Sequence, residues 1–95
     1  MFVRLTNLEL LPDREAEATK IYNEQIVPLV KKQKGNIDIM LLHPLNEKGE
    51  HISYTSWESK EDADAYQQSG KYQELVGMVK HTFSKPATLK SYTVQ

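Results

Sequence analysis

The side chains in this 95-residue chain that could do chemistry are phenols, one indole and an amide in a strand. There is no cysteine, which excludes a thiolate nucleophile, a disulfide and a cysteine-based metal site. His43, His51 and His81 show no metal-ligand spacing, and the 4 glycines form no phosphate-binding run. We therefore expect no metal site and no cofactor, so that any reaction would draw its chemistry mainly from the substrate.

Asn7 is the polar residue that the first strand pattern leaves hardest to explain. Residues 2–10 alternate, and Asn7 falls on the same face as Val3 and Leu5, which we expect to point toward the helices. Asparagine is unfavourable inside a strand, and a buried amide needs hydrogen-bond partners. Asn7 should therefore either pair with neighbouring backbone or line a pocket, and we take it as a candidate catalytic residue.

Aromatic and apolar side chains at regular spacing supply the candidate walls of such a pocket. The alternative for each is ordinary packing, with the ring in the core and any hydroxyl at the surface. Trp57 ends a strand, where packing is the simpler interpretation, and Tyr54 fits either the pocket or a dimer interface. The predicted pocket residues are Tyr22, Tyr54, Trp57, Tyr72, Val76 and Phe83.

The elements that must position these residues follow from hydrophobic periodicity and from turn and capping signals. We expect a helix over residues 13–34 with Asp13 as N-cap, a kink near Glu24–Pro28 and an exit at Gly35. Ser59 and Asp62 indicate a second helix start, and Ser69-Gly70 should interrupt that helix. The expected strands are residues 2–10, 37–42, 52–57 and 89–94, with a turn over 43–50 between the second and third.

The resulting order, β-α-β-β-α-β, predicts an α+β fold of the ferredoxin-like class over residues 1–95 as one domain. Its four-stranded antiparallel sheet would carry helices on one face only. Apolar residues nevertheless fall on both faces of the first two strands, for example Ile39 against Met40 and Leu42. Because an uncovered apolar face of that size is unusual in monomers, we expect a homodimer packed sheet against sheet.

Charge and composition exclude several function classes. Twelve basic residues balance 13 acidic ones without blocks of either sign, which argues against a nucleic-acid partner. No apolar run approaches the roughly 18 residues of a membrane span. The N-terminal residues lack the layout of a signal peptide, so we expect a cytoplasmic protein with no membrane partner.

The run from Ser56 to Ala63, followed by Tyr66 and by Ser69-Gly70-Lys71-Tyr72, resembles the antibiotic biosynthesis monooxygenase domain. The resemblance covers roughly residues 2–94. It implies a dimeric α+β barrel, and it implies that Tyr66 lines the pocket as a second candidate catalytic residue. Family members include cofactor-free oxygenases of phenols and quinols, haem-degrading enzymes, enzymes that modify small signalling molecules, and proteins with no assigned reaction.

Two branches of that family fit the chain less well. The haem-degrading branch uses an Asn, a Trp and an iron-binding His, where this chain has Asn7, Tyr66 and Val76. The branch that acts on signalling molecules has a His where this chain has Lys71. The sequence thus favours a homodimeric, cofactor-independent monooxygenase that acts on a small aromatic molecule. A non-catalytic or stress-related ligand-binding dimer is the alternative, followed by a haem-degrading enzyme.

Overall fold

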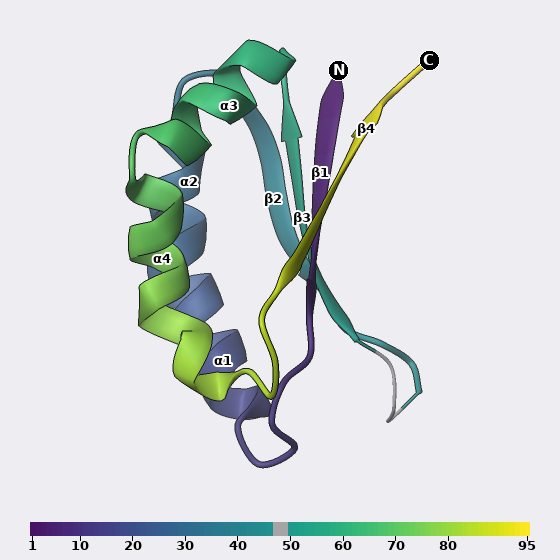
Figure 1. Ribbon diagram of the computed structural model, residues 1–95, viewed down its shortest axis with the longest axis vertical. Helices are drawn as coiled ribbons and strands as arrows, with labels where there is room; N and C mark the ends of the chain where they lie inside the picture. The colour runs from purple at the N-terminus through teal and green to yellow at the C-terminus, as the bar shows by residue number, and fades with distance from the viewer. Residues whose placement is uncertain (47–49) are drawn as a thin grey trace.

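The described part of the chain folds into a four-stranded antiparallel sheet with its helices on one face (Figure 1). The computed structural model describes residues 1–46 and 50–95. The strand order is β2-β3-β1-β4, which is the ferredoxin-like arrangement expected from the sequence. In chain order the elements are β1 (Phe2–Leu8), α1 (Glu15–Ile21), a π-helical turn (Tyr22–Ile26), α2 (Val27–Lys31), β2 (Asn36–Leu42), β3 (His51–Trp57), α3 (Lys60–Gln68), α4 (Lys71–Val79), a 3-10 turn (Lys80–Thr82) and β4 (Thr88–Thr93).

The first helical segment changes its geometry just before Pro28. A proline at this position has no N–H to donate to the carbonyl four residues earlier, and the helix accommodates the loss through the π-helical turn between α1 and α2. The helix is thus irregular in the region of the predicted kink, and the irregularity is a π-helical turn over Tyr22–Ile26. The predicted N-cap at Asp13 is wrong, because Arg14 occupies the cap position and no side chain caps the first turn.

The second helical segment begins and breaks where the sequence indicates. Ser59 is the N-cap of α3, its Oγ accepting a 3.2 Å hydrogen bond from the Asp62 backbone N–H. Gly70 has a φ of 86°, a conformation that glycine adopts without steric cost, and it separates α3 from α4. Part of the turn predicted over 43–50 lies outside the described residues.

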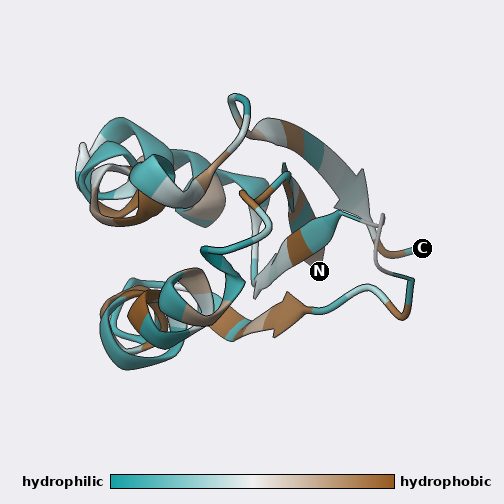
Figure 2. Ribbon diagram, turned by 90° about the horizontal axis from the view of Figure 1, so that it is seen from below, coloured by the Kyte–Doolittle hydropathy of each residue, from teal (hydrophilic) through white to brown (hydrophobic). Residues whose placement is uncertain are grey.

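The core lies between the sheet and the helices, and the other face of the sheet is open (Figure 2). Tyr22, Val30, Trp57, Ala63 and Leu75 are among its buried residues. On the open face, Met40, Leu42 and Tyr92 remain 40%, 41% and 48% exposed. None of the helices in the described part of the chain is long and apolar enough to cross a membrane.

The face of β1 that points toward the helices is the opposite of the one expected. Arg4, Thr6 and Leu8 line the space beneath the helices, whereas Leu5 lies across from Tyr54 of β3 and Lys90 of β4 on the open face. The predicted alternation of side chains along β1 is present, with Arg4, Thr6 and Leu8 on one face and Leu5 and Asn7 on the other. Because both faces of β1 carry apolar residues, however, hydrophobicity alone did not show which one the helices cover.

Two glycines provide a test of this packing. A Cβ on Gly35, whose φ is 80°, would come within 2.1 Å of the Asp62 carboxylate, whereas a Cβ on Gly77 of α4 would meet nothing within 4 Å. We expect Gly35→Ala to lower the free energy of unfolding by more than about 1 kcal/mol. Gly77→Ala should raise it by roughly 0.5–1 kcal/mol, because alanine is the better helix former. Urea denaturation of both variants checks the pair, and equal effects of the two substitutions would contradict the described backbone.

Candidate functional site

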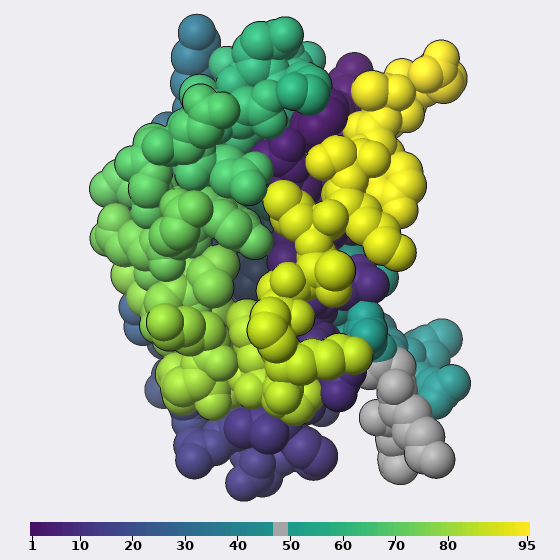
Figure 3. All heavy atoms as spheres, in the orientation of Figure 1, coloured from purple at the N-terminus to yellow at the C-terminus, as the bar shows by residue number. Residues whose placement is uncertain are grey.

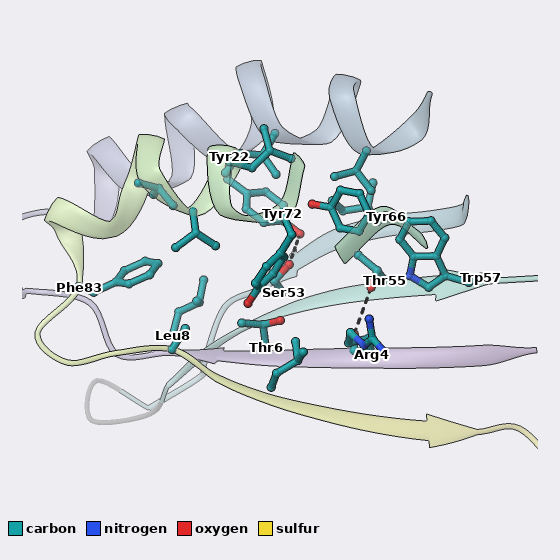
Figure 4. Close-up of a pocket in the computed structure, with 18 residues that line it drawn as sticks. Arg4, Thr6, Leu8, Tyr22, Ser53, Thr55, Trp57, Tyr66, Tyr72 and Phe83 are labelled. Carbon is teal, nitrogen blue, oxygen red and sulfur yellow. Dashed lines mark hydrogen bonds between the residues drawn. The ribbon is translucent and has the colours of Figure 1, made fainter. Parts of the chain in front are cut away.

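A cavity of about 70 Å³ lies between the sheet and the helices. Aromatic rings supply much of its wall, and polar groups project from the strands opposite (Figure 4). Figure 3 shows the surface hollowed between α4, in green, and the yellow segment that leads into β4. The lining residues are Arg4, Thr6, Leu8, Tyr22, Ile26, Val30, Ile39, Ser53, Thr55, Trp57, Tyr66, Tyr72, Leu75, Val76, Val79, Phe83, Ala87 and Leu89.

Arg4 is a buried cation at the strand side of this cavity. Its Nη1 donates to Gln67 Oε1 at 2.9 Å and to the Ala63 carbonyl at 3.4 Å. Its Nη2 lies 3.1 Å from Asp64 Oδ1, and its Nε donates to Ser91 at 3.3 Å. Only 9% of the residue is exposed, so these bonds fix the guanidinium in place between β1, α3 and β4. Hydrogen bonds from Lys60 and Arg4 lower the pKa of the Asp64 carboxyl, which keeps this partner ionised.

The three tyrosines of the cavity are neutral phenols. Burial raises the pKa of Tyr22 to about 12 and raises the pKa of Tyr66 and of Tyr72 above the ordinary value. Near neutral pH each therefore acts as a hydrogen-bond donor or acceptor and not as a base. Tyr22 is already engaged, because its hydroxyl donates to the Met40 carbonyl at 3.1 Å and lies 2.7 Å from Ser53 Oγ.

Two hydrogen-bond donors at the cavity have no partner within the described chain. The Trp57 indole N–H is buried and has no hydrogen-bond partner among the described residues. The Tyr66 hydroxyl makes no hydrogen bond within residues 1–46 and 50–95. The two rings stack, with centroids 5.3 Å apart and planes inclined by 26°. Tyr72 packs its ring edge-on against Tyr66 at 6.2 Å. This corner of the cavity offers donors to a ligand that carries an acceptor oxygen.

The structure places most of the predicted pocket residues in the cavity but not all of them. Tyr22, Trp57, Tyr66, Tyr72, Val76 and Phe83 line it. Asn7 does not, because it lies on the open face of β1 across from Ile52 and Thr88. Tyr54 lies on the same open face, paired with Leu5 and Met40, so the pocket assignment of both residues was wrong.

Sequence reasoning missed the polar groups of the strand side. Arg4, Thr6, Ser53 and Thr55 all line the cavity. The alternation of Arg4 with Val3 and Leu5 was the available signal, but a charged residue in a strand is usually assigned to the solvent face. His81 lies at the surface and pairs with Glu17.

The comparisons with known proteins agree with this architecture. A family model described as antibiotic biosynthesis monooxygenase matches residues 1–77. None of the curated proteins matches the chain.

Among solved structures, the chain is similar to a monooxygenase from the gene ActVA-Orf6 of Streptomyces coelicolor in complex with the ligand Nanaomycin D. The TM-score is 0.84 at 13% identity, covering 99% of this chain and 87% of that one. The chain is also similar to a variant of MhuD with two manganese protoporphyrin IX bound per active site. The TM-score is 0.82 at 20% identity, covering 99% of this chain and 94% of that one. For a conserved protein from Methanosarcina mazei Go1 the TM-score is 0.82 at 16% identity, covering 100% of this chain and 94% of that one. At these identities the likeness shows the fold.

The raised pKa of Tyr22 has a consequence for stability. Unfolded tyrosine ionises near pH 10, so between about pH 10 and 12 the unfolded chain releases a proton that the folded chain retains. The free energy of unfolding should therefore be unaffected by this group below pH 10 and should fall as the pH rises toward 12. Tyr22→Phe should lower stability at pH 8 by about 1 kcal/mol through its lost hydrogen bonds, and should flatten the alkaline fall. Urea titrations at pH 8, 10 and 11 measure both effects, and an unchanged alkaline slope would show that Tyr22 is not the group responsible.

Proposed function

Because the chain belongs to the antibiotic biosynthesis monooxygenase family, we propose that it is a monooxygenase that oxidises a small phenolic or quinol-like aromatic molecule with molecular oxygen and without a cofactor. The observation that carries the proposal is the corner formed by Trp57 and Tyr66. Two donors without partners lie there on stacked rings, in a cavity whose wall also includes a fixed cation, Arg4. Such a corner suits a flat aromatic substrate with an oxygen atom that becomes negatively charged.

The lining residues determine which substrates suit the site. Within the described chain, none of them is a carboxylate or an imidazole, so the cavity wall provides no strong base. The substrate must therefore be acidic enough to lose its proton to water, as an anthrone or a hydroquinone is. The protein's part is to orient the ring and to stabilise the anion with preorganised donors and the nearby guanidinium.

The proposed reaction balances without an added reductant. In an anthrone the methylene activated by the rings loses a proton, and in a hydroquinone a hydroxyl loses it and a ring carbon that carries hydrogen takes the place of the methylene. The anion transfers one electron to dioxygen. The two radicals combine to a peroxide, which takes up a proton and loses water to leave a carbonyl. One methylene and one dioxygen thus yield one carbonyl and one water, and the neutral phenol of Tyr66 can donate to the anionic oxygen throughout.

The size of the cavity requires a movement on binding. About 70 Å³ is less than the roughly 150 Å³ of an engineered cavity that admits benzene, and less than the several hundred Å³ of a typical ligand pocket. The hollow between α4 and the segment before β4 is where the wall would have to open (Figure 3). We infer that an aromatic substrate displaces side chains there as it enters.

The residues of the cavity do not fit haem binding. Within the described chain, its wall has no histidine, cysteine or methionine, and the residue at the position of the family's iron ligand is Val76. The raised pKa values of the three tyrosines also disfavour the tyrosinate that could replace such a ligand. A stoichiometric Soret shift with haemin, lost on mutation of a cavity residue, would overturn this conclusion.

Oxygen uptake with a panel of anthrones and hydroquinones tests the proposed reaction. We expect one dioxygen consumed per product, and we expect Tyr66→Phe to lower kcat about 100-fold, as removal of one oxyanion donor does. Tyr92→Phe is the matched control, because it removes a phenol hydroxyl from the open face of the sheet, outside the cavity, and keeps the ring that the proposed dimer would cover. Uptake that Tyr66→Phe leaves unchanged would refute the site, and saturable binding without any uptake would favour the ligand-binding alternative.

The open face of the sheet supports a second part of the proposal, a homodimer. Met40, Leu42 and Tyr92 are large apolar or aromatic residues 40–48% exposed on that face, beside Leu5 and Tyr54. A second copy packed against the face would remove these side chains from water.

A charge placed on the open face tests the dimer. Leu42→Asp should shift the protein to a monomer in sedimentation experiments at about 10 µM, because it would bury a carboxylate without a partner. Leu45→Asp is the control, since Leu45 is fully exposed in the connection after β2 and should leave the association unchanged. A wild-type protein that sediments as a monomer would contradict the proposed assembly.

A further inference from the structure

Three ligand-type side chains meet at the end of the sheet where β2 and β3 are joined, outside the cavity wall. Glu15 is the first residue of α1, His43 follows β2, and His51 begins β3. One potential ligand atom from each lies within 4.8 Å of the others. Figure 1 shows the start of α1 and this end of the two strands in the same half of the molecule.

His51 is the residue that ordinary packing does not explain. It is 5% exposed, and its Nε2 is buried without a hydrogen-bond partner in the described part of the chain. Buried ring nitrogens are normally paired, because leaving one unpaired forfeits its hydrogen bond to water. Glu15 Oε1 lies only 3.3 Å from this nitrogen, yet the two do not form a hydrogen bond.

A separation of 3.3 Å without a hydrogen bond suits two ligands of one metal ion. A hydrogen bond requires the oxygen to lie along the N–H direction of the ring. Two ligands of one ion instead lie side by side, with both lone pairs aimed at a common third point. For metal–ligand distances of about 2.0–2.1 Å and a tetrahedral angle, the ligand atoms are about 3.4 Å apart. The observed separations from Glu15 Oε1 are 3.3 Å to His51 Nε2 and 3.8 Å to His43 Nδ1.

We propose that Glu15, His43 and His51 bind a divalent first-row transition metal ion, with Zn²⁺ as the reference ion. Two imidazoles and one carboxylate are a ligand set that suits such ions and that alkaline-earth ions do not favour. Three protein ligands leave the remaining coordination positions to water. The ion would tie the start of α1 to the ends of β2 and β3. The inference is independent of the proposed oxygenase activity.

The hairpin supplies two of the ligands through its register. Leu42 pairs with Ile52 across β2 and β3, so the next residues outward, His43 and His51, lie opposite one another. Their rings are in edge-to-face contact with centroids 5.0 Å apart. Glu15 is 56% exposed at its side chain and can adjust toward both rings. The site therefore needs only side-chain rotation to close around an ion.

Titration of the full chain with Zn²⁺ alone, followed by calorimetry or by competition with a chelating dye, tests the proposal. We expect one ion per chain. Glu15→Gln and His43→Ala should each weaken binding by at least about tenfold. Mutating a residue that only supports a metal ligand already costs about that much, and the loss of a direct ligand should cost no less. Both side chains are about half exposed, so these variants should fold, unlike a substitution of the buried His51.

The surface pair of His81 and Glu17 provides a matched control. It also joins one histidine to one carboxylate but lacks a second imidazole, so His81→Ala should leave the Zn²⁺ affinity unchanged. In NMR spectra, Zn²⁺ should shift the ring signals of His43 and His51 and leave those of His81 in place. The absence of saturable binding would overturn the proposal. So would an affinity that Glu15→Gln and His43→Ala leave intact, or one that His81→Ala reduces as much as they do.

Discussion

The buried guanidinium of Arg4 is the interaction on which the arrangement of the cavity depends. It joins the central strand β1 to α3 through Gln67, Asp64 and the Ala63 carbonyl, and to the edge strand β4 through Ser91. A charge this deeply buried is tolerated only because these groups pair with it. The same contacts tie α3 to the strands and place the guanidinium at the cavity wall, so this residue contributes both to the packing around the site and to its electrostatics.

Burial gives the aromatic residues of the cavity complementary properties. The phenols stay protonated because desolvation raises their pKa values, which makes them donors for an anion and poor bases. Trp57 and Tyr66 present flat stacked faces together with two donors that have no partner in the described chain. A site of this kind stabilises the charge of a substrate that ionises by itself. Because the cavity is small, it can admit only a substrate whose entry displaces side chains of the wall.

The sequence predicted the element order because each signal was local. Alternation, the Ser59 cap, the Ser69-Gly70 break and Pro28 each act within a few residues, and all four occur where expected. The side of β1 that the helices cover is a property of the tertiary structure instead. Both faces of that strand carry apolar residues, so Asn7 and Tyr54 were assigned to the cavity although they lie on the open face.

The cluster of Glu15, His43 and His51 escaped the sequence for a related reason. Its carboxylate comes from a helix start far away in the chain, and only the tertiary structure brings it to the two histidines. The hairpin register was the available signal, since it places His43 opposite His51. By contrast, six of the residues that the sequence predicts for the cavity do line it. Helical spacing and strand ends place large side chains on the core side, whichever function those side chains serve.

A crystal structure of the protein with a bound anthrone is the most direct test of whether the cavity beneath the helices is the substrate site. We expect the ring system in the cavity beneath α4, against Trp57 and Tyr66, with its oxygen within hydrogen-bond distance of the Tyr66 hydroxyl or the Trp57 indole N–H. An anthrone bound only on the open face of the sheet, with the cavity closed, would contradict this assignment.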